Sequence, residues 1–236
     1  MARSRILFPL LGAMLLALLA PASATIGIVP IRMTLDARAP LSVFTITNKD
    51  DVAKVVKASL FRWEHQGVTD KLSPSAEVLI SPPVFTIPPH ETQVIRAFAR
   101  KRAGATEQTY RMLVEDSPIG PSSRVGMGVT MHISVPIFVA PSIDSEKKAI
   151  WTVRTAPGSR YIVTLDNASN RHIRVVSIAI DEGKAVLGAV KDPSYVFAGE
   201  RMEWTIVSLA RPALKSVTLD VQADGGDFKQ TMAVTQ

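Results

Sequence analysis

The chain has 236 residues, with 27 Lys and Arg against 21 Asp and Glu, and it contains no cysteine. The lack of cysteine excludes disulfides and thiol catalysis, so hydrophobic burial must hold the fold together. The net charge of +6 is scattered along the chain, without a basic helix, a zinc finger or an aromatic RNA-binding motif, and we expect no nucleic-acid partner.

The first residues have the composition of a secretory signal peptide. Arg3 and Arg5 precede an apolar run at 6–19, and the small residues of PASA follow directly. The alternative is a membrane anchor, but the run is short for one, and no later stretch is long and apolar enough to span a bilayer. The sequence predicts cleavage after Ala24 and an exported, not membrane-inserted chain of 212 residues.

Short β-rich runs separated by turn residues fill the next hundred positions. They lie at 41–48, 55–64, 77–89, 92–100 and 108–116. Two proline pairs interrupt the third run, which is typical of edge strands and turns. Helical periodicity is nearly absent, so the pattern predicts a β-sandwich.

One stretch, VGMGVTMHISVPIFVAP at 125–141, has the strongest pattern in the chain. From 125 to 135 every odd position is apolar and every even position is small or polar. This alternation predicts a long strand with one apolar face. The face either packs on the protein's own core or is covered, over part of its length, by a partner, because an uncovered apolar edge strand is prone to aggregate.

The polar segment APSIDSEKKA predicts a boundary, after which the pattern starts again. Further strands are expected at 195–206, 216–224 and 228–236, and the stretch 161–180 loosely repeats 41–61. Each of those two stretches is a strand, a polar turn with an asparagine (Asn48 or Asn167) and a second strand. Asparagine tolerates left-handed backbone, which suits both turns. We therefore expect domains at 25–141 and 150–236, joined by a linker at 142–149.

No catalytic or metal-binding constellation is visible in the sequence. The histidines stand alone at wide spacing, at His65, His90, His132 and His172. There is no nucleophile elbow, no phosphate-binding glycine loop and no dinucleotide fingerprint. Convergent catalytic triads leave no local signature, so the pattern does not formally exclude an enzyme. We expect no catalytic residue, no metal and no cofactor.

Several segments in a fixed order resemble the PapD-like chaperones of chaperone–usher pilus assembly, and the branch called archaic or alternative in particular. They are IRMTLDARAPLSVFTITN (31–48), VLISPPVFTIPPHETQVIR (78–96), TYRMLVEDSP (109–118), MHISVPIFVAP (131–141) and YVFAGERMEW (195–204). The resemblance implies an all-β protein with two immunoglobulin-like β-sandwich domains in a boomerang arrangement. It also implies a periplasmic chaperone that binds pilin subunits by donor-strand complementation and delivers them to an outer-membrane usher.

The same resemblance assigns roles along the alternating strand. It implies that the pilin groove receives the side chains of Met127, Val129, Met131 and Ile133. The apolar side chains that follow, Val135, Ile137 and Val139, would pack inside the chaperone itself. The alternative is that the whole face is internal core.

The family also grips the carboxylate at the end of the pilin with two basic residues in the cleft between the domains. The first matches Arg32, whose planar guanidinium can bind a carboxylate through two hydrogen bonds. The second would fall on Pro136, which cannot do this, and the arginine usual before the closing proline is Ala140 here. We assign the second role to Arg111 on the neighbouring strand. The alternative for both arginines is an ordinary solvated side chain.

A second hypothesis is a secreted β-sandwich adhesin or a structural component of the pilus. A pilin is expected to be a single domain with an N-terminal donor extension. Two domains and a long alternating internal strand favour the chaperone.

Overall fold

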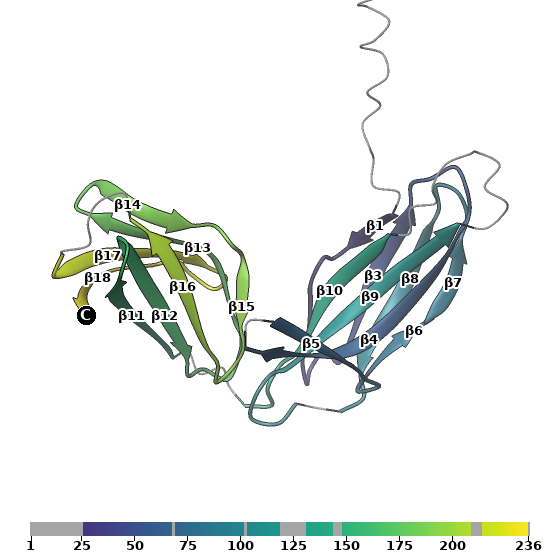
Figure 1. Cartoon of the computed structure of the whole chain (residues 1–236). Helices are drawn as coiled ribbons and strands as arrows, with labels where there is room; N and C mark the ends of the chain where they lie inside the picture. Colours follow the sequence, from purple (N-terminus) through teal and green to yellow (C-terminus); the bar gives the residue numbers. More distant parts are fainter. Residues whose placement is uncertain are drawn as a thin grey trace, which may run out of the picture.

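The computed structural model describes residues 26–67, 69–101, 103–118, 131–143, 148–208 and 214–235. Every regular element among these residues is a β-strand. The strands form two sandwiches that meet at an angle (Figure 1), and the cleft between them is lined by side chains of both domains, among them Trp63, His65, Phe197 and Glu200. The strand pattern predicted such an all-β protein, and the family resemblance implied the boomerang of two immunoglobulin-like domains.

Among the described residues, ten strands build the first domain in two sheets. They are β1 (Ile26–Val29), β2 (Met33–Leu35), β3 (Leu41–Asn48), β4 (Lys54–Gln66), β5 (Thr69–Pro74), β6 (Val78–Ser81), β7 (Val84–Ile87), β8 (Thr92–Ala99), β9 (Gln108–Pro118) and β10 (His132–Val139). One sheet has the order β1-β3-β8-β6, and the other has the order β2-β10-β9-β4-β5 with β7 paired to β4.

Alternation along each strand decides what enters the first core. In β3, Phe44 and Ile46 are fully buried while Leu41 and Val43 are exposed, because successive side chains point to opposite faces. Both sheets bury such residues in one hydrophobic cluster. Burial of this kind replaces the disulfides that the sequence cannot form.

The described part of the second domain contains eight strands around its own hydrophobic cluster. They are β11 (Ala149–Ala156), β12 (Arg160–Asn167), β13 (Ile173–Glu182), β14 (Ala185–Val190), β15 (Ser194–Val196), β16 (Arg201–Val207), β17 (Ser216–Ala223) and β18 (Phe228–Thr235). Strand β18 pairs with both β17 and β11 and so joins the two layers. At the far margin β14 runs so close to β16 that a Cβ on Gly188 would lie 2.4 Å from the carbonyl oxygen of Val207.

The two asparagines of the repeated pattern end strands β3 and β12, but the reason predicted for them is wrong. Neither has a positive φ; among the described residues His90 and Ser159 are the non-glycine residues that do. Asn48 and Asn167 are instead completely buried. Each donates its side-chain amide to three backbone carbonyls and accepts a backbone N–H with its oxygen. The repeat therefore marks two buried hydrogen-bonding corners.

Candidate functional site at the interdomain cleft

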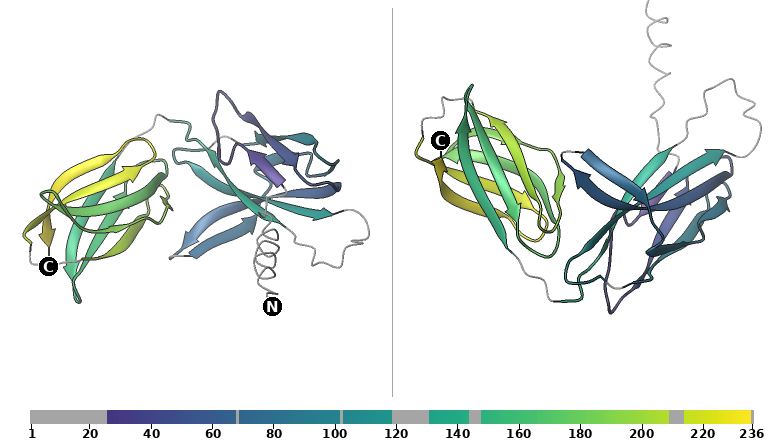
Figure 2. Two further views of the ribbon diagram at one scale, coloured as in Figure 1. Left: turned by 90° about the horizontal axis from the view of Figure 1, so that it is seen from above. Right: turned by 60° about the horizontal axis from the view of Figure 1, so that its bottom comes forward.

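The base of the cleft is closed by a cluster of aromatic rings from both domains. Trp63 and Phe138 of the first domain meet Phe197 and Tyr195 of the second. The ring of Trp63 lies 4.6 Å from that of Phe197 and nearly perpendicular to it, which is a favourable edge-to-face geometry. Figure 2 shows the two sandwiches side by side from two further directions.

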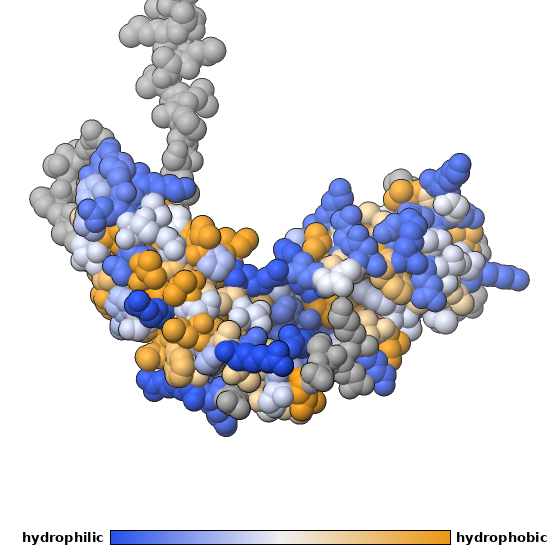
Figure 3. Space-filling model, turned by 180° about the vertical axis from the view of Figure 1, so that it is seen from behind, coloured by the Kyte–Doolittle hydropathy of each residue, from blue (hydrophilic) through white to orange (hydrophobic). Residues whose placement is uncertain are grey.

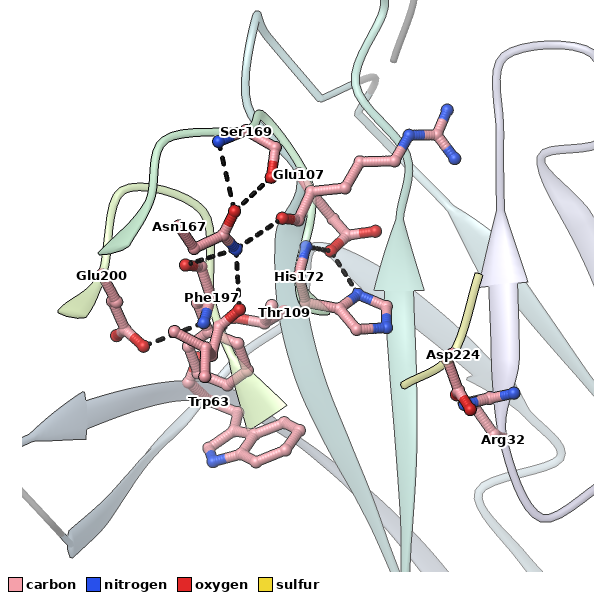
Figure 4. A network of polar contacts seen from close by, with 12 residues as sticks. Arg32, Trp63, Glu107, Thr109, Asn167, Ser169, His172, Phe197, Glu200 and Asp224 are labelled. Carbon is pink, nitrogen blue, oxygen red and sulfur yellow. Dashed lines mark hydrogen bonds and ion pairs between the residues drawn. The ribbon is translucent and has the colours of Figure 1, made fainter. Parts of the chain in front are cut away.

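Two histidine–glutamate pairs cross the junction in opposite directions. His65 of the first domain lies 2.8 Å from the Glu200 carboxylate of the second, and its ring stacks on Phe197. His172 of the second domain lies 2.6 Å from the Glu107 carboxylate of the first, and its backbone N–H donates to the same oxygen at 2.9 Å. Figure 4 shows the second pair beside the buried Asn167 corner. The junction is therefore held by directional bonds as well as by apolar contact.

Strand β10 lies on the side of the first domain nearest the second (Figure 1). Strand β9 pairs with β10 along its whole length, whereas β2 pairs with it only at Ile137–Val139. Among the residues that the structure describes, no strand pairs with the other edge between His132 and Pro136. This part of β10 is an open sheet edge.

The backbone groups at that edge can be assigned from one hydrogen bond. Ala140 donates its N–H to the carbonyl of Leu35 in β2 at 2.7 Å, so its backbone faces the β2 side. Because backbone groups alternate between the two edges of a strand, the even-numbered His132, Ser134 and Pro136 face the same side. Proline has no N–H, and the parallel pairing of Ile137 with Met33 uses the Pro136 carbonyl, so the open edge offers two N–H donors and two carbonyls, those of His132 and Ser134.

The structure describes two of the four apolar side chains predicted for the pilin groove. Met127 and Val129 lie outside the described residues. Met131 and Ile133 are half-buried and pack against the core cluster of the first domain. The side chains that follow at alternate positions, Val135, Ile137 and Val139, are buried in that core, as the sequence predicted.

A buried ion pair fixes the start of the described part of β10. The Asp116 carboxylate accepts the N–H of Met131 at 2.6 Å and pairs with Lys54 at 2.6 Å. The side chains of Asp116 and Lys54 are 2% and 4% exposed. Separating such a pair is costly, because it would leave one buried charge without a partner and without water.

Arg32 lies immediately before β2 and reaches across the cleft to the second domain. Its guanidinium donates to the carboxylate of Asp224, and Arg174 lies 3.5 Å from the other oxygen of that carboxylate. The hydrogen bond to Asp224 raises the pKa of Arg32 above its ordinary value. Figure 4 shows Arg32 and Asp224 facing each other, apart from the polar contacts around Asn167. One carboxylate is thus shared by two arginines from different domains.

Arg111 lies on the same face of the six-stranded sheet but has different partners. Its guanidinium carbon lies 3.7 Å from the centroid of Trp63, and it bonds the Asp70 carboxylate at 3.0 Å and the Ser134 hydroxyl at 3.1 Å. The side chain is 22% exposed. Stacking and ion pairing together make Arg111 a cover over the buried Trp63 at the base of the cleft.

The strand register places Arg32 and Arg111, the two predicted anchors, on opposite sides of β10. Arg111 is paired with Pro136, and Met33 is paired with Ile137, so the residue before Met33 lies next to Pro136 on the opposite side. Side chains in one such row point to the same face of the sheet. Neighbouring strands are about 4.8 Å apart, so the backbones of Arg32 and Arg111 lie about 10 Å apart with β10 between them.

Sequence reasoning missed the groups that fix these arginines and the junction. Asp224, Arg174, Glu107 and Asp116 carried no motif and no periodicity. The weak signal available was the double glycine after Asp224, which indicates a tight turn at the end of a strand.

Apolar side chains are also exposed around the first domain, as Figure 3 shows from behind in orange. Val29 and Ile31, which precede Arg32, are 67% and 78% exposed. Exposed apolar surface of this kind next to an open strand edge is typical of a site that a partner covers.

The described residues contain no helix long and apolar enough to cross a membrane. They contain no group of three or more side chains arranged to hold a metal ion.

Comparison with known proteins agrees with this architecture. Residues 25–143 match the family model of the pili and flagellar-assembly chaperone, PapD N-terminal domain. No curated protein matches the chain in sequence.

Three solved structures illustrate the similarity of fold. One is the CsuC–CsuE chaperone–tip adhesion subunit complex from archaic chaperone–usher Csu pili of Acinetobacter baumannii, at 21% identity over 90% of this chain and 99% of that chain, with a TM-score of 0.60. A second is the Salmonella enterica SafA pilin in complex with the SafB chaperone, at 13% identity over 92% of this chain and 99% of that chain, with a TM-score of 0.62. A third is the Pseudomonas aeruginosa CupB2 chaperone, at 15% identity over 86% of this chain and 97% of that chain, with a TM-score of 0.57.

These identities are low and carry the fold alone, whereas the family model spans half of the chain. The chain belongs to the PapD-like family of pilus-assembly chaperones.

Proposed function

We propose that this protein captures pilin subunits in the periplasm by donating strand β10 and releases them to an outer-membrane usher. Members of the chaperone–usher family are periplasmic and are not enzymes, and we assign no catalytic residue. We also propose that the signal peptide is cleaved after Ala24, and that the domains span 25–141 and 150–236 with a linker at 142–149. Structures similar in fold, from Acinetobacter baumannii and Salmonella enterica, contain a chaperone together with a tip adhesion subunit or a pilin.

The observation that carries the proposal is the open edge of β10. Its backbone groups between His132 and Pro136 face a side where no described strand pairs with them. An extended segment of another protein can complete such an edge with main-chain hydrogen bonds, a mode of recognition seen in chaperone–pilin complexes. β10 is therefore the strand to be shared.

The position of Arg32 sets the direction and the end of the added strand. β2 takes over the edge from Ile137 onward, so a partner strand must stop beside Pro136, next to Arg32. A chain that ends there with its carboxylate at Arg32 runs parallel to β10. Since a strand can slip by two residues and keep the same face, this fixed end would set the register.

Side chains would add to the backbone pairing. The resemblance assigns Met127, Val129, Met131 and Ile133 to the pilin groove, and the two described members are half-buried in the chaperone alone. Covering their remaining surface contributes about 25 cal/mol per Å² of apolar area, before ordering costs. Methionine adapts to differently shaped grooves because its unbranched side chain is flexible.

The test is co-expression with a pilin and affinity purification of the complex. Ser134→Pro removes an N–H from the open edge and leaves the pairing with β9 intact, so we expect loss of the complex and little change in the stability of the free chaperone. Ser134→Ala is the matched control, because it removes only the hydroxyl that bonds Arg111. A wild-type yield of complex from Ser134→Pro would show that β10 is not the shared strand.

The anchor is tested in the same assay. We expect Arg32→Ala to abolish the stable complex, whereas Arg96→Ala, an exposed arginine on β8 in the other sheet, leaves it intact. Equal yields from the two variants would remove the anchor role from Arg32.

A further inference from the structure

The carboxylate of Asp224 already occupies the arginine proposed to bind a pilin. Asp224 follows β17 at the start of a turn made by Gly225 and Gly226, which have φ values of 95° and 132°. Its N–H donates to the carbonyl of Arg174 at 2.9 Å, which fixes its position at the rim of the cleft. From there its side chain bonds Arg32 of the other domain and Arg174 of its own.

We propose that Asp224 is a built-in competitor for the carboxylate at the end of the pilin. It holds Arg32 in the unloaded chaperone and gives it up when a pilin binds. The inference rests on the proposed function of Arg32 and concerns the regulation of that same site.

The exposure of the pair is suited to exchange. The side chains of Arg32 and Asp224 are 42% and 34% exposed, so solvent and salt weaken their attraction. A carboxylate delivered by a strand that is also bonded along β10 can therefore replace Asp224. The Lys54–Asp116 pair, at 4% and 2% exposure, has no such freedom.

Arg174 lowers the energetic cost of separating Asp224 from Arg32. When Arg32 turns to the incoming carboxylate, Asp224 retains the guanidinium of Arg174 at 3.5 Å and the backbone bond beside it. No charge is left without a partner. Loading then breaks one contact between the domains while the aromatic cluster and the two histidine–glutamate pairs remain.

The alternative is that the Arg32–Asp224 pair is only a tie between the domains. The two alternatives predict different effects on carboxylate affinity when the charge of Asp224 is removed. If Asp224 competes, removing its charge strengthens carboxylate binding at Arg32; if it is only a tie, the same change leaves binding unaltered or weakens it.

The experiment is a calorimetric titration of the mature protein with a short peptide copied from the C-terminal end of the co-expressed pilin. The peptide is used with a free carboxylate and with a C-terminal amide. We expect Asp224→Asn to bind the carboxylate form about two- to fivefold more tightly than the wild type, as expected for removal of an exposed ion pair. The amide form should bind both proteins equally.

Two further variants isolate the effect. Asp220→Asn, which removes a carboxylate on β17 that is paired with Lys229 of β18, should leave both affinities unchanged. The double variant Asp224→Asn with Arg32→Ala should lose the gain, because the gain acts through Arg32. Unchanged or weaker carboxylate binding by Asp224→Asn would overturn the inference while the wild-type preference for the carboxylate form upholds the anchor. If the wild type binds neither peptide nor pilin, the proposed function and this inference fall together.

Discussion

The two domains contain the same buried corner, and only one of the two corners reaches outside its own domain. Asn48 donates to the carbonyls of Val52, Ile87 and Pro88, and its N–H donates to Glu91. Asn167 makes the equivalent bonds to Arg171, Val196, Phe197 and Glu200. In both cases the end of one strand is bonded to a residue four positions later and to the end of a strand in the facing layer.

The difference lies in what the bonded residues touch next. All partners of Asn48 belong to the first domain. In the Asn167 corner, Phe197 packs on Trp63, Glu200 pairs with His65, and the carbonyl of Asn170 accepts the N–H of Glu107. A local motif that closes a sandwich at one place thus also sets the angle between the domains at the other.

Breaking the corners should have the largest effect on stability. Asn48→Ala and Asn167→Ala each leave three buried or partly buried carbonyls without their donor, and we expect a loss of about 3 kcal/mol in the free energy of unfolding of the affected domain. Chemical denaturation followed by tryptophan fluorescence measures it. Gln230→Ala, an exposed amide on β18, is the control and should be neutral.

The same two variants should also differ in their effect on the angle between the domains. Asn167→Ala should also alter the interdomain angle, measured by small-angle X-ray scattering under native conditions, whereas Asn48→Ala should not. An identical scattering profile for both would mean that the Asn167 corner does not position the junction.

A smaller effect is expected from the link that joins the Asn167 corner to the first domain. Glu107→Gln weakens the bonds to the ring and backbone of His172, and we expect a cost of about 2 kcal/mol and a wider distribution of interdomain angles. Glu203→Gln is the control, because its carboxylate is exposed. A variant with unchanged stability and scattering would show that the aromatic cluster holds the junction alone.

The smallest effect on stability should come from Arg111. Arg111→Lys keeps the charge but loses the planar stacking on Trp63, and we expect a cost of about 1 kcal/mol. If Arg111 acts as an anchor through its charge, this variant still captures pilin while Arg111→Ala does so poorly. Equal capture by wild type, Arg111→Lys and Arg111→Ala would assign Arg111 to the junction only.

Much of the fold could be read from the sequence, because a strand's burial pattern is local. The run at 41–48 became β3 with the same bounds, and the run at 92–100 became β8 with one residue fewer. The third run, at 77–89, split into β6 and β7 at its first proline pair. The short strands β1, β5 and β14 were not predicted, since four to six residues are too few to establish an alternation, and the eight-residue β11 was not predicted either.

The family resemblance supplied Arg32 as a candidate, but the sequence alone gave no indication of its partner. Arg32 and Asp224 are 192 positions apart, and His65 and Glu200 are 135 apart. Contacts at such separations depend on how two complete domains meet, and they leave no spacing that a single sequence can display.

The sequence by itself determined most of the strands and the two cores, because alternation acts over a few residues, and its composition predicts an export signal. Only the tertiary structure decided which edge of β10 stays open, since that depends on where the three residues of β2 pair. It also decided that Asp224 shares Arg32 and that a repeated asparagine corner became part of the junction. These features arise from the meeting of surfaces, whose physical requirement is complementarity between distant residues.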